Sequence, residues 1–246
     1  MAISFELDSI ATTLEGLEET IINKCIDRAQ FKANDPAYQA GTSGFSGESE
    51  KSLFDLRLRY QEEMDAQFGR FCVPEERPFT EGLPAARRRV SVGETGLAVT
   101  DYNCVRLTPR ILDAYLKLVP CLCPAGDDGQ YGSGVEHDIY ALQAVSRRIH
   151  FGAFFVAESK YRSEPAVYQD MIGSGDWDGI MQRLTRREIE ERILDRVSEK
   201  VEAVQAGINR LVRVYVPAET ILTFYRDTII PLTKQGQLMY FRNRRR

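Results

Sequence analysis

Apolar residues recur at steps of three and four along most of this chain, which is the period of an amphipathic helix. The first clear case extends from about Phe5 to Gln30 and is ended by Asn34 and Pro36. Its apolar positions are Ile10, Leu14, Leu17, Ile21, Ile22 and Cys25. No stretch shows sustained strand alternation, and we find no internal repeat. The pattern therefore predicts an all-α fold.

Seven further helices are expected, and several have recognisable ends. Thr108 followed by Pro109 is typical of an N-cap with proline at the first helical position. Thr185 stands three residues before Glu188, which is the spacing of a capping box. Pro231 lies inside the last helix, where we expect a kink. The expected ranges are 50–71, 108–122, 138–161, 165–173, 176–183, 185–206 and 218–242.

The connection before the third expected helix is unusually long. Residues 72–106 include three consecutive arginines, Arg87 to Arg89. Connections of this length are uncommon unless they have a role, so we expect 72–106 to be a long ordered loop. The 246 residues are ample for a hydrophobic core. We interpret 1–246 as a single domain.

The stretch from Asp138 to Tyr161 is apolar on more than one face and contains no proline. Its apolar positions are too widely spread for a narrow stripe, which indicates a central, mostly buried helix. It nevertheless carries Arg147, Arg148 and Lys160. Buried cations require anions beside them. Two interpretations follow: the anions are Asp or Glu side chains of neighbouring helices, or the anion is a ligand.

The composition of the chain indicates which partners and cellular locations to expect. The formal charge of −4 and the pI near 5.5 argue against a nucleic-acid partner. We interpret the basic tail, residues 243–246, as a frayed, solvated end. Five cysteines without clustered histidines indicate reduced thiols and no metal site. No apolar run reaches membrane-spanning length, and the early acidic residues exclude a signal peptide. The expected location is the cytoplasm, with secretion only if a leader has been removed.

Two segments of the central stretch resemble a known family. Residues 146–152, Ser-Arg-Arg-Ile-His-Phe-Gly, and residues 155–160, Phe-Val-Ala-Glu-Ser-Lys, are similar to the central helix of the eukaryotic-type, all-helical chorismate mutases of yeast and plants. The resemblance covers nearly the whole chain and implies a multi-helix bundle around a long central helix, assembled as a homodimer. Further matching segments are Leu17–Ile22, Pro74–Phe79, Tyr131–Ser133, Gly179–Met181, Ile189–Leu194 and Ile229–Thr233.

The resemblance also implies a reaction, the intramolecular rearrangement of chorismate to prephenate in phenylalanine and tyrosine biosynthesis. This reaction uses no cofactor, no covalent intermediate and no proton transfer. The substrate is a dicarboxylate, and breaking its ether bond leaves negative charge on the ether oxygen. A catalyst must hold the compact conformer through its carboxylates and place donors at that oxygen.

By resemblance, five side chains perform this chemistry. Arg148 is the bidentate carboxylate clamp, and Lys160 contacts the ether oxygen and a carboxylate. Glu190 accepts a hydrogen bond from the ring hydroxyl. Thr233 and Gln237 lie four residues apart and so share a helix face. Gln237 donates a second hydrogen bond to the ether oxygen, where the yeast enzyme carries a glutamate that donates only when protonated.

Two substitutions depart from the family pattern. Ala11 stands where the first helix of the family carries an arginine that binds a substrate carboxylate. Losing such a contact typically costs ~2–4 kcal/mol. Arg186 replaces an asparagine one turn before Glu190; it either pairs with Glu190 or points into the pocket and supplies the missing charge. We expect Arg147 and Arg186 to be additional substrate-binding residues.

A one-residue difference affects the central helix. Arg148 and Lys160 are twelve residues apart here and eleven apart in the family. Eleven steps of about 100° bring two side chains to within roughly 20° of each other, whereas twelve steps separate them by about 120°. We therefore expect a one-residue π-bulge between Gly152 and Phe155 to restore the common face.

The regulatory site of the family is only partly matched. Gly132 and Ser133 fit the site where yeast-type members bind aromatic amino acids at the dimer interface. However, Glu136 replaces a threonine, and Gly69-Arg70 keeps only one of two arginines. We expect weak or absent control by tryptophan and tyrosine.

Each expected site residue also has a structural interpretation. Lys160 would lie at a surface turn, and Thr233 would satisfy the carbonyl freed by Pro231. Glu190 would pair with Arg186 or Arg187. The alternative function is a chorismate-mutase-like protein with reduced or lost catalysis that acts as a binding or regulatory partner. The missing arginine and the register difference favour this alternative, whereas retention of the other site residues favours the enzyme.

Overall fold

Every regular element in the computed structural model is helical over residues 5–245, the part of the chain that the structure describes. The all-α prediction is confirmed. None of the helices in this part is long and apolar enough to cross a membrane. Two π-helical segments occur, at Gly152–Val156 and Tyr225–Ile229. The α-helices are α1 (Leu7–Arg28), α2 (Leu53–Gln67), α3 (Thr108–Leu122), α4 (Tyr131–Phe151), α5 (Ala157–Ser163), α6 (Pro165–Ser174), α7 (Trp177–Leu184), α8 (Arg187–Gln205), α9 (Ala218–Phe224) and α10 (Ile230–Asn243).

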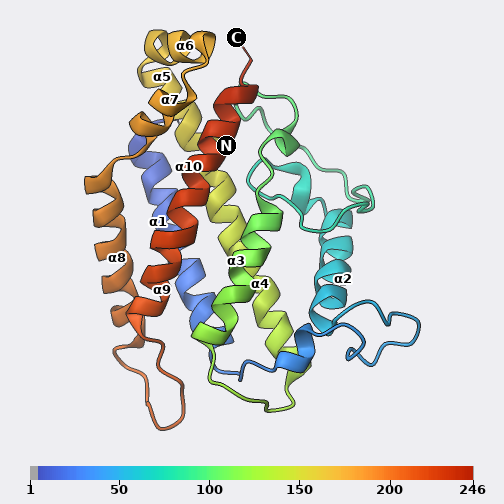
Figure 1. Cartoon of the computed structure of the whole chain (residues 1–246). Helices are drawn as coiled ribbons and strands as arrows, with labels where there is room; N and C mark the ends of the chain where they lie inside the picture. The colour runs from blue at the N-terminus through green and yellow to red at the C-terminus, as the bar shows by residue number, and fades with distance from the viewer. Residues whose placement is uncertain (1–4, 246) are drawn as a thin grey trace.

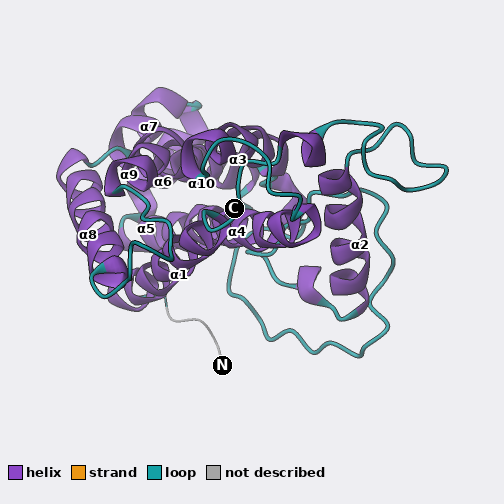
Figure 2. Cartoon of the chain, turned by 90° about the horizontal axis from the view of Figure 1, so that it is seen from below, coloured by secondary structure: helices purple, strands orange, loops and turns teal. Residues whose placement is uncertain are grey.

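The helices form two layers (Figures 1 and 2). One layer contains α1 and α4 side by side, and the other contains α3, α9 and α10. Helix α8 packs at one side against α1 and α9, while α2 covers the opposite side against α4. The short helices α5, α6 and α7 gather at the end of the molecule where α10 finishes (Figure 1). The core between the layers includes the fully buried Ile21, Ile139, Leu142, Val145 and Ile149.

A buried ion pair fixes α1 against α4. Arg28 Nε donates to Asp138 Oδ1 at 2.6 Å, and neither side chain is exposed. The same carboxylate accepts hydrogen bonds from Tyr38 at 2.5 Å and from Tyr115 at 2.9 Å. The other guanidinium nitrogens donate to Tyr38 and to backbone carbonyls just after α1. Because each charge in this cluster is partnered, the cluster is a structural element of the core.

The central rod consists of α4, a π-helical segment and α5 in one continuous run (Figure 1). The π-helical segment spans Gly152–Val156, so the predicted bulge is confirmed. Helix α10 packs on this segment. A Cβ atom on Gly152 would lie 2.7 Å from Thr233 Cγ2, and one on Gly236 would lie 2.5 Å from Ala153 Cβ. The two glycines therefore allow α10 to approach the widened turn closely.

A π-helical segment interrupts the last long helical run, residues 218–243, near the point where a kink was expected. Helix α9, the π-helical segment Tyr225–Ile229 and α10 follow one another, and Pro231 lies in the first turn of α10. Proline has no N–H to donate within a helix. The widened turn just before it accommodates the missing hydrogen bond. Thr233 Oγ1 donates to the Ile229 carbonyl at 2.7 Å, which is not the carbonyl four residues before Pro231.

Several predicted helix ends are wrong. Helix α4 begins at Tyr131, well before residue 138. Thr108 is the first residue of α3, and Leu107 is its N-cap. Thr185 does not cap α8, because its Oγ1 donates to the Met181 carbonyl at the end of α7. Thr185 lies between two helices, so its hydroxyl could donate to a carbonyl at the end of α7 or accept from an N–H group at the start of α8. Sequence spacing alone could not decide between these two bonds.

The long loop and the tail are both anchored. Glu62 on α2 accepts hydrogen bonds from the backbone N–H groups of Phe79 at 2.9 Å and Thr80 at 2.6 Å. Arg244 Nε donates to the buried Glu158 carboxylate at 2.9 Å, and Arg245 N–H donates to a loop carbonyl, Ala98 O, at 2.8 Å. The expected frayed tail is therefore wrong for these two arginines. The last residue, 246, lies outside the described residues.

We predict opposite effects of alanine at two helical glycines. Gly236→Ala places a methyl group 2.5 Å from Ala153 Cβ. Helix α10 must then shift, so the free energy of unfolding should fall by about 1–3 kcal/mol. Gly16→Ala is the matched control, because nothing lies within 4 Å of the added atom. It should raise the free energy of unfolding by about 0.5–1 kcal/mol. Urea unfolding measures both values, and equal effects would contradict the close approach of α10.

Candidate active site

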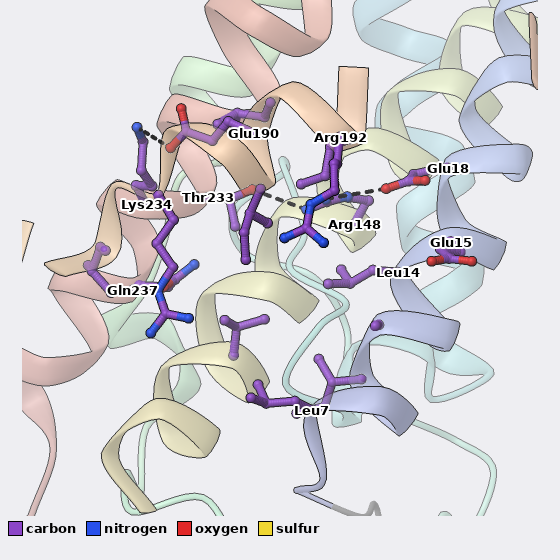
Figure 3. A pocket seen from close by; sticks show the side chains of 18 of the residues that line it. Leu7, Leu14, Glu15, Glu18, Arg148, Glu190, Arg192, Thr233, Lys234 and Gln237 are labelled. Carbon is purple, nitrogen blue, oxygen red and sulfur yellow. Dashed lines mark hydrogen bonds and ion pairs between the residues drawn. The ribbon is translucent and has the colours of Figure 1, made fainter. Parts of the chain in front are cut away.

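A cavity of about 450 Å³ opens between α1, α4, α5, α8 and α10 (Figure 3). This volume lies within the range of pockets that hold small ligands. Cationic side chains line the cavity from α4, α5, α8 and α10, while α1 contributes four apolar residues and three carboxylates. The apolar lining includes Leu7, Ile10, Ala11, Leu14, Val156 and Ile193.

Arg148 enters the cavity from α4 with only 4 % of its side chain exposed. Its Nη2 lies 3.7 Å from Glu18 Oε1, and its Nη1 donates to Thr233 Oγ1 at 3.4 Å. Both contacts are long, because charge-assisted hydrogen bonds are usually about 2.7–2.9 Å. Its Nε has no hydrogen-bond partner within the described chain. A buried guanidinium with such weak partners is suited to binding a further anion.

Lys160 enters from α5 and contacts α10. Its Nζ donates to Gln237 Oε1 at 3.2 Å. Because the amide oxygen faces Lys160, the NH₂ group of Gln237 remains available to donate into the cavity. Burial, reinforced by the charge of Arg186 and opposed by Glu190, lowers the pKa of Lys160 to about 8. The lysine therefore remains mostly charged at neutral pH.

Glu190 and Arg186 approach from the start of α8. Glu190 Oε1 accepts a hydrogen bond from Lys234 Nζ at 2.8 Å, so its ion-pair partner comes from α10. Arg186 lines the cavity, and its charge acts on Lys160. Arg186 was expected either to pair with Glu190 or to point into the pocket. In the structure it lines the pocket, and Glu190 pairs with Lys234.

The balance of charge in the cavity favours an anionic ligand. Among the described residues, its lining contains six cationic side chains and four carboxylates. The excess of two positive charges would be neutralised by a dianion. Water cannot neutralise charge, so a doubly charged ligand gains more from this cavity than a neutral one.

Known proteins share both the sequence and the fold. The chorismate mutase of Schizosaccharomyces pombe is 34% identical over 243 residues, which cover 96% of this chain and 94% of that protein. The chain belongs to the eukaryotic chorismate mutases. The Candida albicans chorismate mutase, solved in complex with L-Trp, has a TM-score of 0.88 at 30% identity over 98% of this chain and 92% of that one. AtCM1, solved with phenylalanine bound in an allosteric site, has a TM-score of 0.85 at 30% identity over 97% of this chain and 96% of that one. No protein-family model matches the chain.

The cavity gathers most of the residues singled out by the chorismate mutase resemblance, but not Arg147. The side chain of Arg147 is 47 % exposed, and its Nε lies 3.5 Å from Glu76 Oε1. Successive helix residues point about 100° apart, so Arg147 turns away when Arg148 faces the cavity. The expectation that Arg147 binds the substrate is corrected. The residues that do line the cavity are Arg148, Lys160, Arg186, Glu190, Thr233 and Gln237.

The four effector-site-like residues lie away from the cavity. Gly132 and Ser133 belong to the exposed first turn of α4. Arg70 forms ion pairs at 2.9 and 3.1 Å with two carboxylates of its own region. Glu136 forms an ion pair with Arg57 at 3.0 Å. Both charged members of this group are thus already partnered within the chain.

Sequence reasoning missed six charged residues that line the cavity: Asp8, Glu15, Glu18, Arg192, Arg196 and Lys234. Glu18 is fully buried and accepts hydrogen bonds from Arg196 at 3.0 and 2.9 Å. The spacing of Arg192, Arg196 and Lys200 at steps of four indicates one helix face. Only the packing reveals that this face meets α1. Lys234 carries no comparable signal in the sequence.

We predict that kcat/KM for chorismate is flat near neutrality and falls as the pH rises above about 8. Lys160 loses its positive charge above its pKa of about 8, and kcat/KM reports ionisations of the free enzyme. Gln237 donates at any pH because it is an amide. Gln237→Glu should instead give a rate that falls from mildly acid to neutral pH. Such a fall in the wild-type chain would contradict the role of Gln237.

Proposed function

We propose that this chain rearranges chorismate to prephenate inside the cavity, using the residues that line it. The observation that supports the proposal most directly is Arg148, a buried guanidinium with an unpartnered Nε and only long contacts elsewhere. It faces a cavity with an excess of two positive charges. A dicarboxylate supplies the opposite charges and offers the paired oxygens that a guanidinium binds.

Binding begins with the substrate carboxylates. Arg148 binds one of them through two parallel N–H groups, and Thr233 holds the guanidinium in position. Arg186 adds positive charge near Lys160. Fixing the carboxylates favours the compact conformer, in which the two carbons that become bonded lie close together.

The rearrangement breaks the ether C–O bond and forms a C–C bond within one molecule, so all atoms and electrons remain in the product. Lys160 and the NH₂ group of Gln237 donate to the ether oxygen, on which negative charge grows. Lys234 binds Glu190 Oε1, which leaves Oε2 for the ring hydroxyl. In other enzymes, one donor at a developing negative charge contributes about 3–4 kcal/mol.

Chorismate consumption by purified variants tests the proposal. The wild-type chain should convert chorismate to prephenate. Arg148→Met should lower kcat/KM by about 100-fold, since losing one partner of a buried charge pair costs about 3 kcal/mol. Arg147→Met removes the same side chain from the neighbouring position and should retain activity, because Arg147 lies beside Glu76. An inactive wild-type chain, or equal losses in the two variants, would contradict the proposal.

The expected weak control by aromatic amino acids is part of the proposal. Two relatives were solved with an aromatic amino acid bound. In this chain, Arg70 is held by two carboxylates, and Glu136 is held by Arg57. Neither side chain is free to bind an amino acid without losing an ion pair. The homodimer remains a prediction from the resemblance, and the cytoplasmic location remains a prediction from the composition and the acidic N-terminal residues.

Titration of tryptophan and tyrosine against activity measures this control. Each should change kcat/KM by less than the roughly 5-fold that a weak allosteric coupling produces. Glu136→Thr releases Arg57 and removes a negative charge from the site, so it should increase the response. A wild-type response above about 5-fold would show that the ion pairs rearrange when the effector binds.

A further inference from the structure

Two adjacent helices carry opposite charges at matching steps of four residues. Arg196 Nη1 lies 3.3 Å from Glu15 Oε1, and Lys200 Nζ lies 3.2 Å from Glu19 Oε1. Arg196 also pairs with Glu18, and Lys200 also reaches Glu18 and the Glu15 carbonyl, so both cations meet residues 15–19 of α1. The two helices run in the same direction (Figure 1). Residues four apart lie on one helix face, so this register extends along both helices.

One turn nearer the N-termini, the same register places Arg192 opposite Ala11. Both residues line the cavity. Alanine offers no carboxylate, and Arg192 forms no ion pair with any residue from 5 to 245. Its Nε donates to the Glu188 carbonyl of its own helix at 3.3 Å. Figure 3 shows the Arg192 side chain pointing into the cavity, where Arg148 also lies.

We propose that Arg192 binds the second carboxylate of the substrate while Arg148 binds the first. This inference rests on the proposed function, because it takes chorismate as the dicarboxylate. Asp8 and Glu15 of α1 also line the cavity, but Arg192 is exposed and forms an ion pair with neither, so its guanidinium is available for a ligand anion. Without Arg192 the cavity would be left one positive charge short of balancing a dianion.

Arg186 does not occupy the same place. Arg186 is the N-cap of α8, whereas Arg192 lies more than one turn further along that helix. The register between α1 and α8 places Arg192 against α1, where Ala11 and Leu14 line the cavity. The second carboxylate of the substrate, bound on the α1 side of the cavity, would contact Arg192.

Steady-state kinetics with chorismate test the assignment. Arg192→Met should lower kcat/KM by about 30-fold or more, mainly through a higher KM, because a charge-assisted contact to the substrate is lost. Arg187→Met is the matched control, because it removes an exposed arginine of the same helix that does not line the cavity. It should stay within about twofold of the wild type. Adding Ala11→Arg to Arg192→Met returns a guanidinium to the same place and should restore at least about tenfold.

A second pair of variants tests the register without altering Arg192. Ala11→Glu places a carboxylate opposite Arg192, which should capture the guanidinium as Glu15 captures Arg196. It should therefore lower kcat/KM by at least about tenfold more than Ala11→Gln, which has the same size and no charge. Equal losses in these two variants would overturn the inference.

The outcomes separate the two proposals. A wild-type chain that does not consume chorismate overturns the proposed function and this inference with it. An active wild-type chain in which Arg192→Met behaves like Arg187→Met overturns this inference alone. Thermal unfolding of each variant shows whether a loss of activity comes from a loss of fold.

Discussion

The buried carboxylate of Glu18 holds together three of the helices that build the cavity, α1, α4 and α8. It lies on α1, and three cations surround it: Arg148 from α4, and Arg196 and Lys200 from α8. A buried carboxylate without such partners would cost several kcal/mol, so α1, α4 and α8 are constrained to pack where these cations meet. Arg196 and Lys200 also pair with Glu15 and Glu19, whereas Glu18 is the one ion-pair partner of Arg148 among the described residues. Because that contact is long, Arg148 can bind an anion in the neighbouring cavity.

Two buried arginines of this fold show how the degree of pairing separates a structural from a functional role. Arg28 lies 2.6 Å from Asp138, and its remaining donors meet a tyrosine and backbone carbonyls. Arg148 lies 3.7 Å from Glu18 and has an unpartnered Nε. The first side chain has no capacity left for a ligand. The second retains most of its hydrogen-bonding capacity, and it lines a cavity large enough for one.

The widened turn of the central rod brings Arg148 and Lys160 to the same cavity. Twelve residues of straight α-helix would separate them by about 120°, and the π-helical segment absorbs the extra residue. Helix α10 packs on this turn through Gly236, opposite Ala153. The same helix presents Gln237 to Lys160. The π-helical segment and the packing of α10 on it therefore together place Arg148, Lys160 and Gln237 at one cavity.

The sequence by itself was enough to predict the helices and the buried central helix, because a repeat of 3.6 residues is a local property. The bulge was predicted by comparing the twelve-residue spacing of Arg148 and Lys160 with the eleven of the family. The sequence also identified Arg148, Lys160 and Gln237 through segments shared with the family. Only the tertiary structure decided that Arg147 faces away from the cavity. It also decided that Glu190 pairs with Lys234, which lies 44 residues further along the chain. Periodicity records which face of a helix is buried. Which two faces then meet, and so which charges pair and which remain for a ligand, depends on packing between distant segments.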